Sequence, residues 1–536
     1  MKVLKEGWQG IFRRTILSLL PVEHLEKNFS EETGRPTKEL YSVCGLLLLM
    51  EYFGWSMETA RLNYMVDLGL QYALNIEHDR SELSERTLYR YIKLLREESW
   101  AQEIMVKVTD KLLKELNLDI REQRLDSTHV FSNMAFWSRR QLIYKVIRRF
   151  LIQVKRHALG KYRSLNPEMV HLYEQNNGWI FGETSPMKLN RGGKVFTAEE
   201  HLGHDMQILL EKFGADPQFN RTPTYADMAR VFTEQFLDND GKVELNPHPG
   251  GQILLNPSDR DAEIGHKGVG YQVQIAETCA ETNPVQLITA AIPQGASQPD
   301  QTSLPEVLNK LEHEDHLPEK LFADGGYGCD ANFVTAASMN VDLAAPAPPR
   351  SNRKGLDDCS FNKNGIMLRC PAGNTPMFKE FRNGSYRAVF FLETCNHCPF
   401  RDICSSEKCG KKNRQFKYQK ADLRSVNRRK IEASDDFKRE YGKKRVPIEG
   451  LNGRLKQFTP LRRLRVRGRQ CVFHSILAIL TVHNIMQMAR YYQKKTFLSA
   501  KCLSMTIFAY FTALFARFFA SKNTIRGFFN FSFAIF

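Results

Sequence analysis

The order of strand-like and helix-like segments in the middle of the chain is the feature that most limits its fold. Residues 268–278 alternate apolar and polar side chains, which is typical of a half-buried strand. The segments that follow switch between strand and helix periodicity, and this order predicts an α/β fold. In order, they are a partner strand at 286–293, a helix at 302–314, a strand at 319–324, a helix near 332–339 and a strand at 341–348.

The rest of the chain divides by composition around this segment. Its 536 residues suit roughly three packed units. The expected regions are a helical N-terminal domain at 1–110, an α/β domain at 115–495 and a Phe-rich tail at 496–536. The α/β domain is expected to contain a helical insertion at 136–250 and a Cys-rich insertion at 350–419.

Charge points to a polyanionic partner. The chain has 76 Lys and Arg against 60 Asp and Glu, a formal net charge of +16. Residues 420–469 alone hold 17 basic and 6 acidic residues. Part of this surplus could lie on a solvated helix face, but its concentration favours a nucleic-acid surface.

Two aspartates follow short apolar strands. Asp126 comes after the strand pattern at 120–125, and Asp324 ends the segment Leu-Phe-Ala-Asp. Open α/β sheets place their sites at the carboxyl ends of strands, so these two side chains are candidates for one site. The structural alternatives are a capping role for Asp126 and an ordinary turn at Asp324.

A third acidic residue, Glu449, lies in the basic region. Pro447 predicts that a helix begins there, which puts Glu449 in its first turn and Arg445 just outside. Glu449 and Lys456 then lie on the same helix face. Lys456 can therefore contact the same region of a bound phosphate that Glu449 reaches through a metal ion. Three converging carboxylates can hold two divalent ions, Mg²⁺ or Mn²⁺, for phosphodiester chemistry. The alternative is a solvated basic helix with a surface Glu.

Further basic residues are expected to contact DNA phosphates. They follow the Glu449 helix and, with Arg445 and Lys456, form the predicted phosphate-binding set: Arg462, Arg463, Arg465, Arg467 and Arg469. Recognition of a specific sequence is assigned to residues 1–110, around Arg86 and Arg90. Helix patterns there fit a helix-turn-helix and an ordinary helical bundle equally well.

The 11 cysteines indicate a metal rather than disulfides. The N-terminus lacks the apolar segment of a signal peptide, so we expect a reducing cytoplasm and no membrane. Cys395 and Cys398 have the two-residue gap of a zinc site, and Cys370 and Cys404 can complete a structural Zn²⁺ tetrad. The spare candidates are His397, Cys359 and Cys409, and the alternative is a loop of reduced thiols.

Taken together, these motifs resemble those of bacterial insertion-sequence transposases of the DDE type. The family's R-x3-E-x6-K signature is present as Arg445, Glu449 and Lys456, and Asp126 and Asp324 match its two aspartates. The family pattern has a Tyr with two residues between it and the Arg, whereas three residues separate Tyr441 from Arg445. The Cys-rich block and the segment "DRDAEIGHKGVGYQVQIAET" are also similar to this family.

The resemblance implies a ribonuclease H-like mixed sheet flanked by helices. It also implies an enzyme that uses two Mg²⁺ or Mn²⁺ ions to cut the ends of its element and join them to target DNA. Its partner would be double-stranded DNA, bound by a homodimer or larger synaptic assembly at the nucleoid.

Three other functional classes are considered. One is a sequence-specific DNA-binding regulator with a zinc module, and another is a metal-dependent nuclease without strand transfer. The third is a membrane-associated protein anchored by the tail, which has 11 Phe between residues 497 and 536. A terminal helix that covers an apolar surface is favoured over an anchor, because Arg517 interrupts the apolar run.

Overall fold

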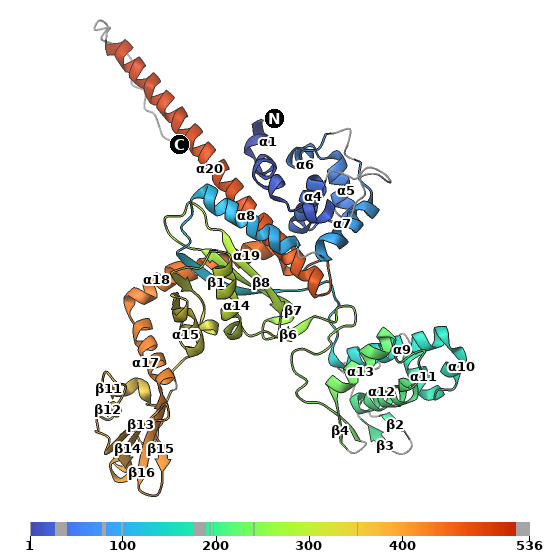
Figure 1. The fold of residues 1–536 in the computed structure, drawn as a ribbon, viewed down its shortest axis with the longest axis vertical. Helices are drawn as coiled ribbons and strands as arrows, with labels where there is room; N and C mark the ends of the chain where they lie inside the picture. The colour runs from blue at the N-terminus through green and yellow to red at the C-terminus, as the bar shows by residue number, and fades with distance from the viewer. Residues whose placement is uncertain are drawn as a thin grey trace, which may run out of the picture.

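The computed structural model describes residues 2–26, 40–77, 82–97, 100–174, 189–191, 194–196, 198–239, 242–350 and 352–520. A mixed sheet lies at the centre of the molecule, with helices on its faces and two modules that extend away from it (Figure 1). The α/β class expected from the sequence is confirmed.

The central sheet has six strands in the order β10-β9-β1-β7-β6, with β8 also paired to β7. β1 runs antiparallel to β7 and parallel to β9, and β9 runs parallel to β10. The strand bounds are β1 Glu122–Val130, β6 Glu263–Gly265, β7 Gly268–Thr278, β8 Ile288–Gly295, β9 Lys320–Phe322 and β10 Asp342–Ala344.

The first strand is longer than the sequence predicted. The expected strand stops at Leu125, but β1 continues to Val130 because it pairs with β7 over its whole second half. β9 pairs only with Glu122–Arg124. Asp126 therefore lies within β1, two residues beyond the point where β9 ends.

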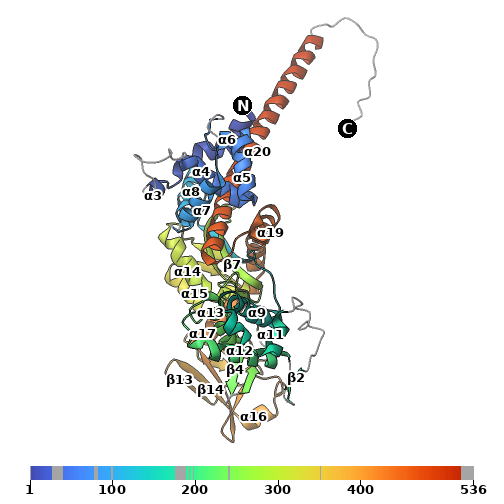
Figure 2. The ribbon, with the colours of Figure 1, turned by 90° about the vertical axis from the view of Figure 1, so that its right-hand side faces the viewer.

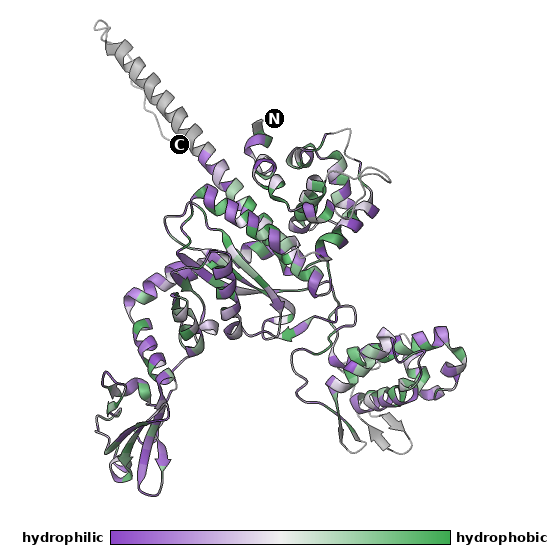
Figure 3. Cartoon of the chain, viewed as in Figure 1, coloured by the Kyte–Doolittle hydropathy of each residue, from purple (hydrophilic) through white to green (hydrophobic). Residues whose placement is uncertain are grey.

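Helices cover the sheet on both sides. α14 (Asp300–His313) and α15 (Asp330–Ser338) connect β8 to β9 and β9 to β10, and their apolar residues pack with Leu125 and Leu321. α18 (Asp435–Arg445) leads directly into α19 (Pro447–Phe458), and both contact β1. α18 is largely hydrophilic in Figure 3, in keeping with its basic sequence.

Two modules are inserted between strands of this sheet. The segment between β1 and β6 forms a helical module with its own apolar cluster, around Phe150, Leu209 and Phe219. Its elements are α9 (Arg139–His157), α10 (Leu159–Arg163), α11 (Pro167–Glu174), β2 (Leu189–Arg191), β3 (Lys194–Phe196), α12 (Ala198–Gly214), α13 (Pro223–Gln235), β4 (Phe236–Asn239) and β5 (Lys242–Leu245).

The Cys-rich segment after β10 forms a small β module. Its four-stranded sheet has the order β13-β14-β16-β15, beside the hairpin β11-β12. α17 (Lys420–Glu432) leads from this module back toward α18. The bounds are β11 Ser360–Phe361, β12 Met367–Arg369, β13 Phe378–Arg382, β14 Ser385–Phe391, α16 Leu392–Asn396, β15 Glu407–Cys409 and β16 Asn413–Gln419.

The N-terminal helices share one core with the end of the chain. A single apolar cluster contains residues from Ile11 to Ala489, including Tyr271 and Ile275 of β7. α20 (Arg469–Ala520) contacts α4, α8 and β8. The helices are α1 Lys2–Glu6, α2 Trp8–Ile11, α3 Glu23–Glu26, α4 Leu40–Phe53, α5 Met57–Val66, α6 Leu68–Ala73, α7 Glu85–Glu97 and α8 Trp100–Leu116.

Beyond this core, α20 continues away from the body of the molecule (Figures 1 and 2). The sequence predicts a terminal helix that covers an apolar surface. The backbone of residues 496–520 instead extends away from the body and does not pack along it. Among the described residues, only Arg469–Lys495 is apolar and long enough to cross a membrane, and 78% of that window is buried inside the protein. A buried core helix meets the same criterion.

Candidate active site

Asp126 is the most buried acidic residue of the candidate site, with its side chain 10% exposed. Burial raises its pKa above the usual value, and the positive charge of Arg445 offsets only part of this effect. Its Oδ2 accepts a hydrogen bond of 2.9 Å from the Asn452 amide, which comes from α19. The strand and the following helix are thereby joined at the site.

Asp324 begins the turn that follows β9. Its side chain accepts a 2.8 Å hydrogen bond from the backbone N–H of Gly326, so it caps a short 3₁₀ turn as well as facing the site. The Tyr441 hydroxyl donates to the carbonyl of the preceding residue, Ala323, at 2.9 Å. Tyr441 therefore holds the loop that carries Asp324, in spite of its shifted spacing from Arg445.

Glu449 lies in the first turn of α19, and this helix begins at Pro447 as the sequence predicted. Its side chain is 69% exposed, in contrast to Asp126. α18 ends at Arg445, only one residue before α19 begins, so Arg445 and Glu449 are on adjacent turns.

The Arg445 guanidinium brings the three acidic residues into one site. Its Nη2 lies 3.4 Å from Asp126 Oδ1 and 3.8 Å from Asp324 Oδ2, and its Nη1 lies 3.4 Å from Glu449 Oε1. The structure thus brings together residues separated by more than 300 positions in the sequence. It also places Arg445 against carboxylates, while its contact with phosphate stays a prediction.

The three carboxylates suit hard divalent cations in their chemistry, since all their donors are oxygen atoms. They also already converge on one positive charge. Asn452 Oδ1 is a buried acceptor without a hydrogen-bond partner among the described residues, and it is on the side chain that contacts Asp126. In the described part of the chain, however, no three His, Cys, Asp or Glu side chains are arranged to hold a metal ion. The three carboxylates are instead arranged around the Arg445 guanidinium.

A second polar group beside β1 was not predicted from the sequence. Lys267 Nζ lies 2.9 Å from Asp300 Oδ2 and also donates to the Ser127 hydroxyl. Burial alone would raise the pKa of Asp300, but hydrogen bonds from Ser127 and Lys267 lower it below its usual value. The only sequence signal was the position of Lys267 just before the strand at 268–278.

Lys456 adds positive charge to the same side of the sheet. Burial lowers the pKa of Lys456, and the charges of Lys267 and Arg462 lower it further. Burial also lowers the pKa of His129 to about 4, with a contribution from Lys456. A half-buried Lys that is repelled by other cations is electrostatically suited to an anion such as phosphate.

The arginines after α19 fall into two groups. Arg463 and Arg467 donate to the backbone carbonyls of Met134 and Asn133, just after β1. Arg469 lies 3.0 Å from Glu263. Arg462 and Arg465 have exposed side chains with no partner among the described residues.

The predicted end-recognition residues lie on α7. Arg86 and Arg90 are both exposed on this amphipathic helix. α7 packs against α4, α5 and α8, and its apolar residues belong to the core that also contains α20. The structure thus has these helices in a bundle, and the contact of Arg86 and Arg90 with DNA stays a prediction.

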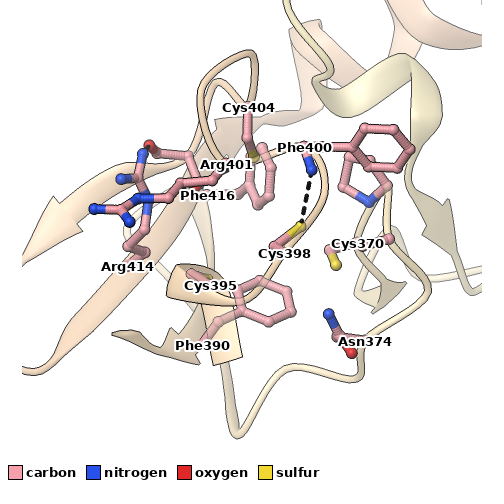
Figure 4. Close-up of a pocket in the computed structure, with 13 residues that line it drawn as sticks. Cys370, Asn374, Phe390, Cys395, Cys398, Phe400, Arg401, Cys404, Arg414 and Phe416 are labelled. Carbon is pink, nitrogen blue, oxygen red and sulfur yellow. Dashed lines mark hydrogen bonds between the residues drawn. The ribbon is translucent and has the colours of Figure 1, made fainter. Parts of the chain in front are cut away.

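The four predicted zinc ligands line one small cavity in the Cys-rich module. Cys370, Cys395, Cys398 and Cys404 surround a space of about 20 Å³, together with Phe390 and Phe416 (Figure 4). Burial raises the pKa of Cys395, and its three neighbouring thiols add to the effect.

The spare candidates lie at different distances from this cavity. Cys359 lies next to Cys370 and Cys404, and burial raises its pKa to about 12. Cys409 accepts from Arg387 and does not line the cavity, and His397 bonds to the Glu393 carbonyl. As they stand, these described side chains form no metal-binding cluster.

Comparison with known proteins found a family model that covers part of this site. A protein-family model described as a transposase DDE domain matches residues 369–489. The match includes Arg445, Glu449, Lys456 and the four cysteines, and it begins after Asp126 and Asp324. Searches of curated proteins and of solved structures found no match.

Proposed function

We propose, from the premise that this chain belongs to the insertion-sequence DDE transposases, that Asp126, Asp324 and Glu449 are its catalytic carboxylates. The family match makes DNA the substrate. The finer proposal is that the enzyme cleaves the ends of its element and joins the freed 3′-hydroxyls to target DNA. The order and direction of the central strands are compatible with the ribonuclease H-like sheet that this assignment requires.

Each residue of the site has a different proposed role. Asp126 on β1 and Asp324 in the turn after β9 form the fixed part of the site, and Glu449 is the exposed part that can approach from α19. Lys456 is proposed to hold the phosphate next to the scissile bond. Asn452 orients Asp126 through its 2.9 Å hydrogen bond.

Asp126, Asp324 and Glu449 would hold two Mg²⁺ or Mn²⁺ ions, which when bound supply activated water and stabilise the leaving oxygen. Until such ions bind, Arg445 offsets part of the negative charge of the carboxylates, because its guanidinium is within 3.8 Å of all three. We propose that Arg445 then turns toward a DNA phosphate, the contact that its position in the signature implies.

The convergence of all three carboxylates on Arg445 is the observation that carries this proposal. It is tested by incubating the protein with the DNA that flanks its gene, with and without Mg²⁺. The wild type should produce end-specific cleavage and joined products. Asp324→Ala should lose both but keep DNA binding, since the basic surface is unchanged.

Two outcomes would contradict parts of this assignment. Full cleavage by Asp324→Ala would remove Asp324 from the catalytic set. Cleavage without any joined product would favour the alternative of a metal-dependent nuclease. We propose a homodimer or larger synaptic assembly as the active form, acting at the nucleoid in the cytoplasm.

We also propose that Cys370, Cys395, Cys398 and Cys404 hold a structural Zn²⁺ ion. What supports this is that all four line one cavity in a module whose apolar core is small. Four thiolates are a common donor set for a closed structural zinc site. Small shifts of the loop 395–404 would be needed, since the thiols are not arranged around an ion.

Metal analysis of protein purified without chelator tests the zinc proposal. About one zinc per chain is expected. Cys395→Ser combined with Cys398→Ser should lose it, whereas Cys409→Ser should keep it as the matched control. Zinc-free protein, or full zinc retention by the double variant, would refute the site.

A further inference from the structure

A large open cleft lies on the Cys-rich module, apart from the carboxylates and from the Cys cavity. Its volume is about 680 Å³, and it is bounded by the β11-β12 turn, by β13 and β14, and by α17. This size falls within the usual range of ligand-binding pockets. No function assigned so far uses it.

The charge of the cleft has one sign. Four of its lining residues are cationic and none is acidic: Lys363, Lys420, Arg424 and Lys430. Arg424 is bound by both carboxylate oxygens of Asp330. The three lysines are exposed and make no ion pair with another described residue. The nearby Asp422 is engaged at the start of α17, where it accepts from the Gln419 N–H.

An exposed aromatic ring lies among these cations. Phe381 is 48% exposed and lines the cleft, with Lys420 Nζ 5.9 Å from its ring centre. Its inner side is supported by Tyr386 at 4.4 Å, which stacks in turn on Tyr418 at 5.1 Å. The ring is therefore held firmly while part of it faces solvent. The exposed part of the ring offers an apolar face on which a planar ligand can stack.

Two asparagines add hydrogen-bonding groups to the cations and the aromatic ring of the cleft. Asn362 and Asn427 are exposed and line the same cleft. The Asn362 oxygen already accepts from the N–H groups of Asn364 and Ile366, so Asn362 offers its amide N–H groups, whereas an amide such as that of Asn427 can both donate to and accept from the edge of a base. A supported aromatic ring with cations beside it is the combination that binds unpaired nucleotides, by stacking and by phosphate contact. An acidic peptide would use the lysines but leave Phe381 uncovered.

We infer that this cleft binds unpaired nucleotides of DNA, with a base against Phe381 and phosphates at Lys363, Lys420 and Lys430. The inference rests on the proposed function only for its choice of DNA. It adds a second DNA site that contains no catalytic carboxylate. The nucleotides of a single-stranded or locally opened segment are its ligand class.

The experiment measures binding of the full chain to a fluorescent oligothymidylate of about 12 nucleotides in EDTA, by fluorescence anisotropy. Phe381→Ala should weaken binding roughly 5- to 150-fold, the range that stacking of one base supports. Phe381→Trp should retain it. The matched control is Phe378→Ala, because Phe378 is 47% exposed on the same strand and does not line the cleft.

Charge is tested separately. Lys363→Gln, Lys420→Gln and Lys430→Gln together should lower the slope of log K against log[salt] by about 2, at ~0.7 per phosphate contact on a single strand. Lys379→Gln, on β13 outside the lining, should leave the slope within error. Polyglutamate should compete poorly with the oligonucleotide.

Equal affinities of Phe381→Ala and Phe378→Ala would overturn the inference, as would effective competition by polyglutamate. The assay contains no Mg²⁺ and no element-end sequence, so it does not depend on catalysis. If the protein cleaves no DNA but binds the oligonucleotide through Phe381, the proposed function fails and the cleft stands. If cleavage is normal and Phe381→Ala binds the oligonucleotide like wild type, the inference about the cleft fails and the proposed function is unaffected.

Discussion

At the scale of single residues, the site depends on side chains that hold the carboxylates as much as on the carboxylates themselves. Arg445 lies close to three acidic residues, Asn452 donates to Asp126, and Tyr441 donates to the backbone just before Asp324. Apart from the Arg445–Glu449 pair, these contacts join the helical pair α18–α19 to β1 and to the loop after β9. The geometry of the site therefore depends on how α18 and α19 pack against the sheet.

Replacing Asn452 by Ala tests this dependence. We expect about a 10- to 100-fold loss of cleavage, because outer residues that orient metal ligands typically contribute that much. The concentration of Mn²⁺ for half-maximal cleavage should rise, while DNA binding and melting temperature stay close to wild type. Gln457→Ala, an exposed position on the same helix, is the control. An unchanged Mn²⁺ requirement would show that Asn452 does not position Asp126.

At the scale of elements, the segment after α19 combines a structural role with the proposed contacts to DNA. It pairs with the end of β1, where Leu464 N–H donates to Phe131 O at 2.8 Å and Asn133 N–H donates to Val466 O at 2.9 Å. Arg463 and Arg467 strengthen this junction, whereas Arg462 and Arg465 face outward.

Arg462→Gln with Arg465→Gln should therefore weaken binding to all duplex sequences alike. The salt slope should fall by about 0.9 for each phosphate contact that is lost. The melting temperature should not change, since neither side chain has a partner in the described structure. Arg467→Gln should instead lower the melting temperature. The prediction fails if the double variant binds unrelated DNA like wild type at several salt concentrations.

α20 makes stability dependent on pH through two buried histidines. Burial lowers the pKa of His474 and of His483 from 6.5 to about 3. The folded protein keeps both rings neutral, whereas the unfolded chain protonates them below pH 6.5. The unfolded state then binds more protons, so the free energy of unfolding falls as pH drops from 6.5 toward 3, by up to ~1.4 kcal/mol per pH unit for each His.

His474→Phe should reduce the change in the free energy of unfolding with pH by the contribution of one histidine. The ring that stacks near Trp100 is kept, at a centre distance of 6.4 Å in the wild type, and the titrating group is lost. Melting temperatures between pH 7 and pH 5 measure the effect. His313→Phe, at an exposed position on α14, should leave the slope unchanged. Identical slopes for wild type and His474→Phe would contradict the assignment.

The sequence predicted elements better than it predicted contacts. Alternation predicted β7, and Pro447 predicted the start of α19, because both signals are local. β1 extends beyond its expected end because β7, more than 140 residues away, continues to pair with it. Asn452 and Lys267 were missed because nothing local distinguishes them from other polar residues, and their roles arise only from tertiary contacts.

At the scale of the whole molecule, the body and the projecting part of α20 are separable. Among the side chains that the structure describes, the apolar contacts of this helix with the core lie within residues 472–492. A chain ending at Lys495 should therefore keep its melting temperature within about 2 °C, the shift expected for less than ~1 kcal/mol. It should also stay in the soluble fraction. Aggregation of the shortened chain, or a drop of more than about 5 °C, would show that residues 496–536 stabilise the body.

The shared core of the N-terminal helices and α20 has a consequence for synthesis on the ribosome. Residues such as Phe12 and Leu47 are translated early, but their apolar partners on α20, among them Ile479 and Ile485, come more than 430 residues later. The first helices must wait for almost the whole chain before their common core can close. A prematurely terminated product would leave this apolar surface exposed to solvent. Such a product should therefore be degraded by proteases, and it should not persist as a short fragment that competes with the full-length protein for DNA.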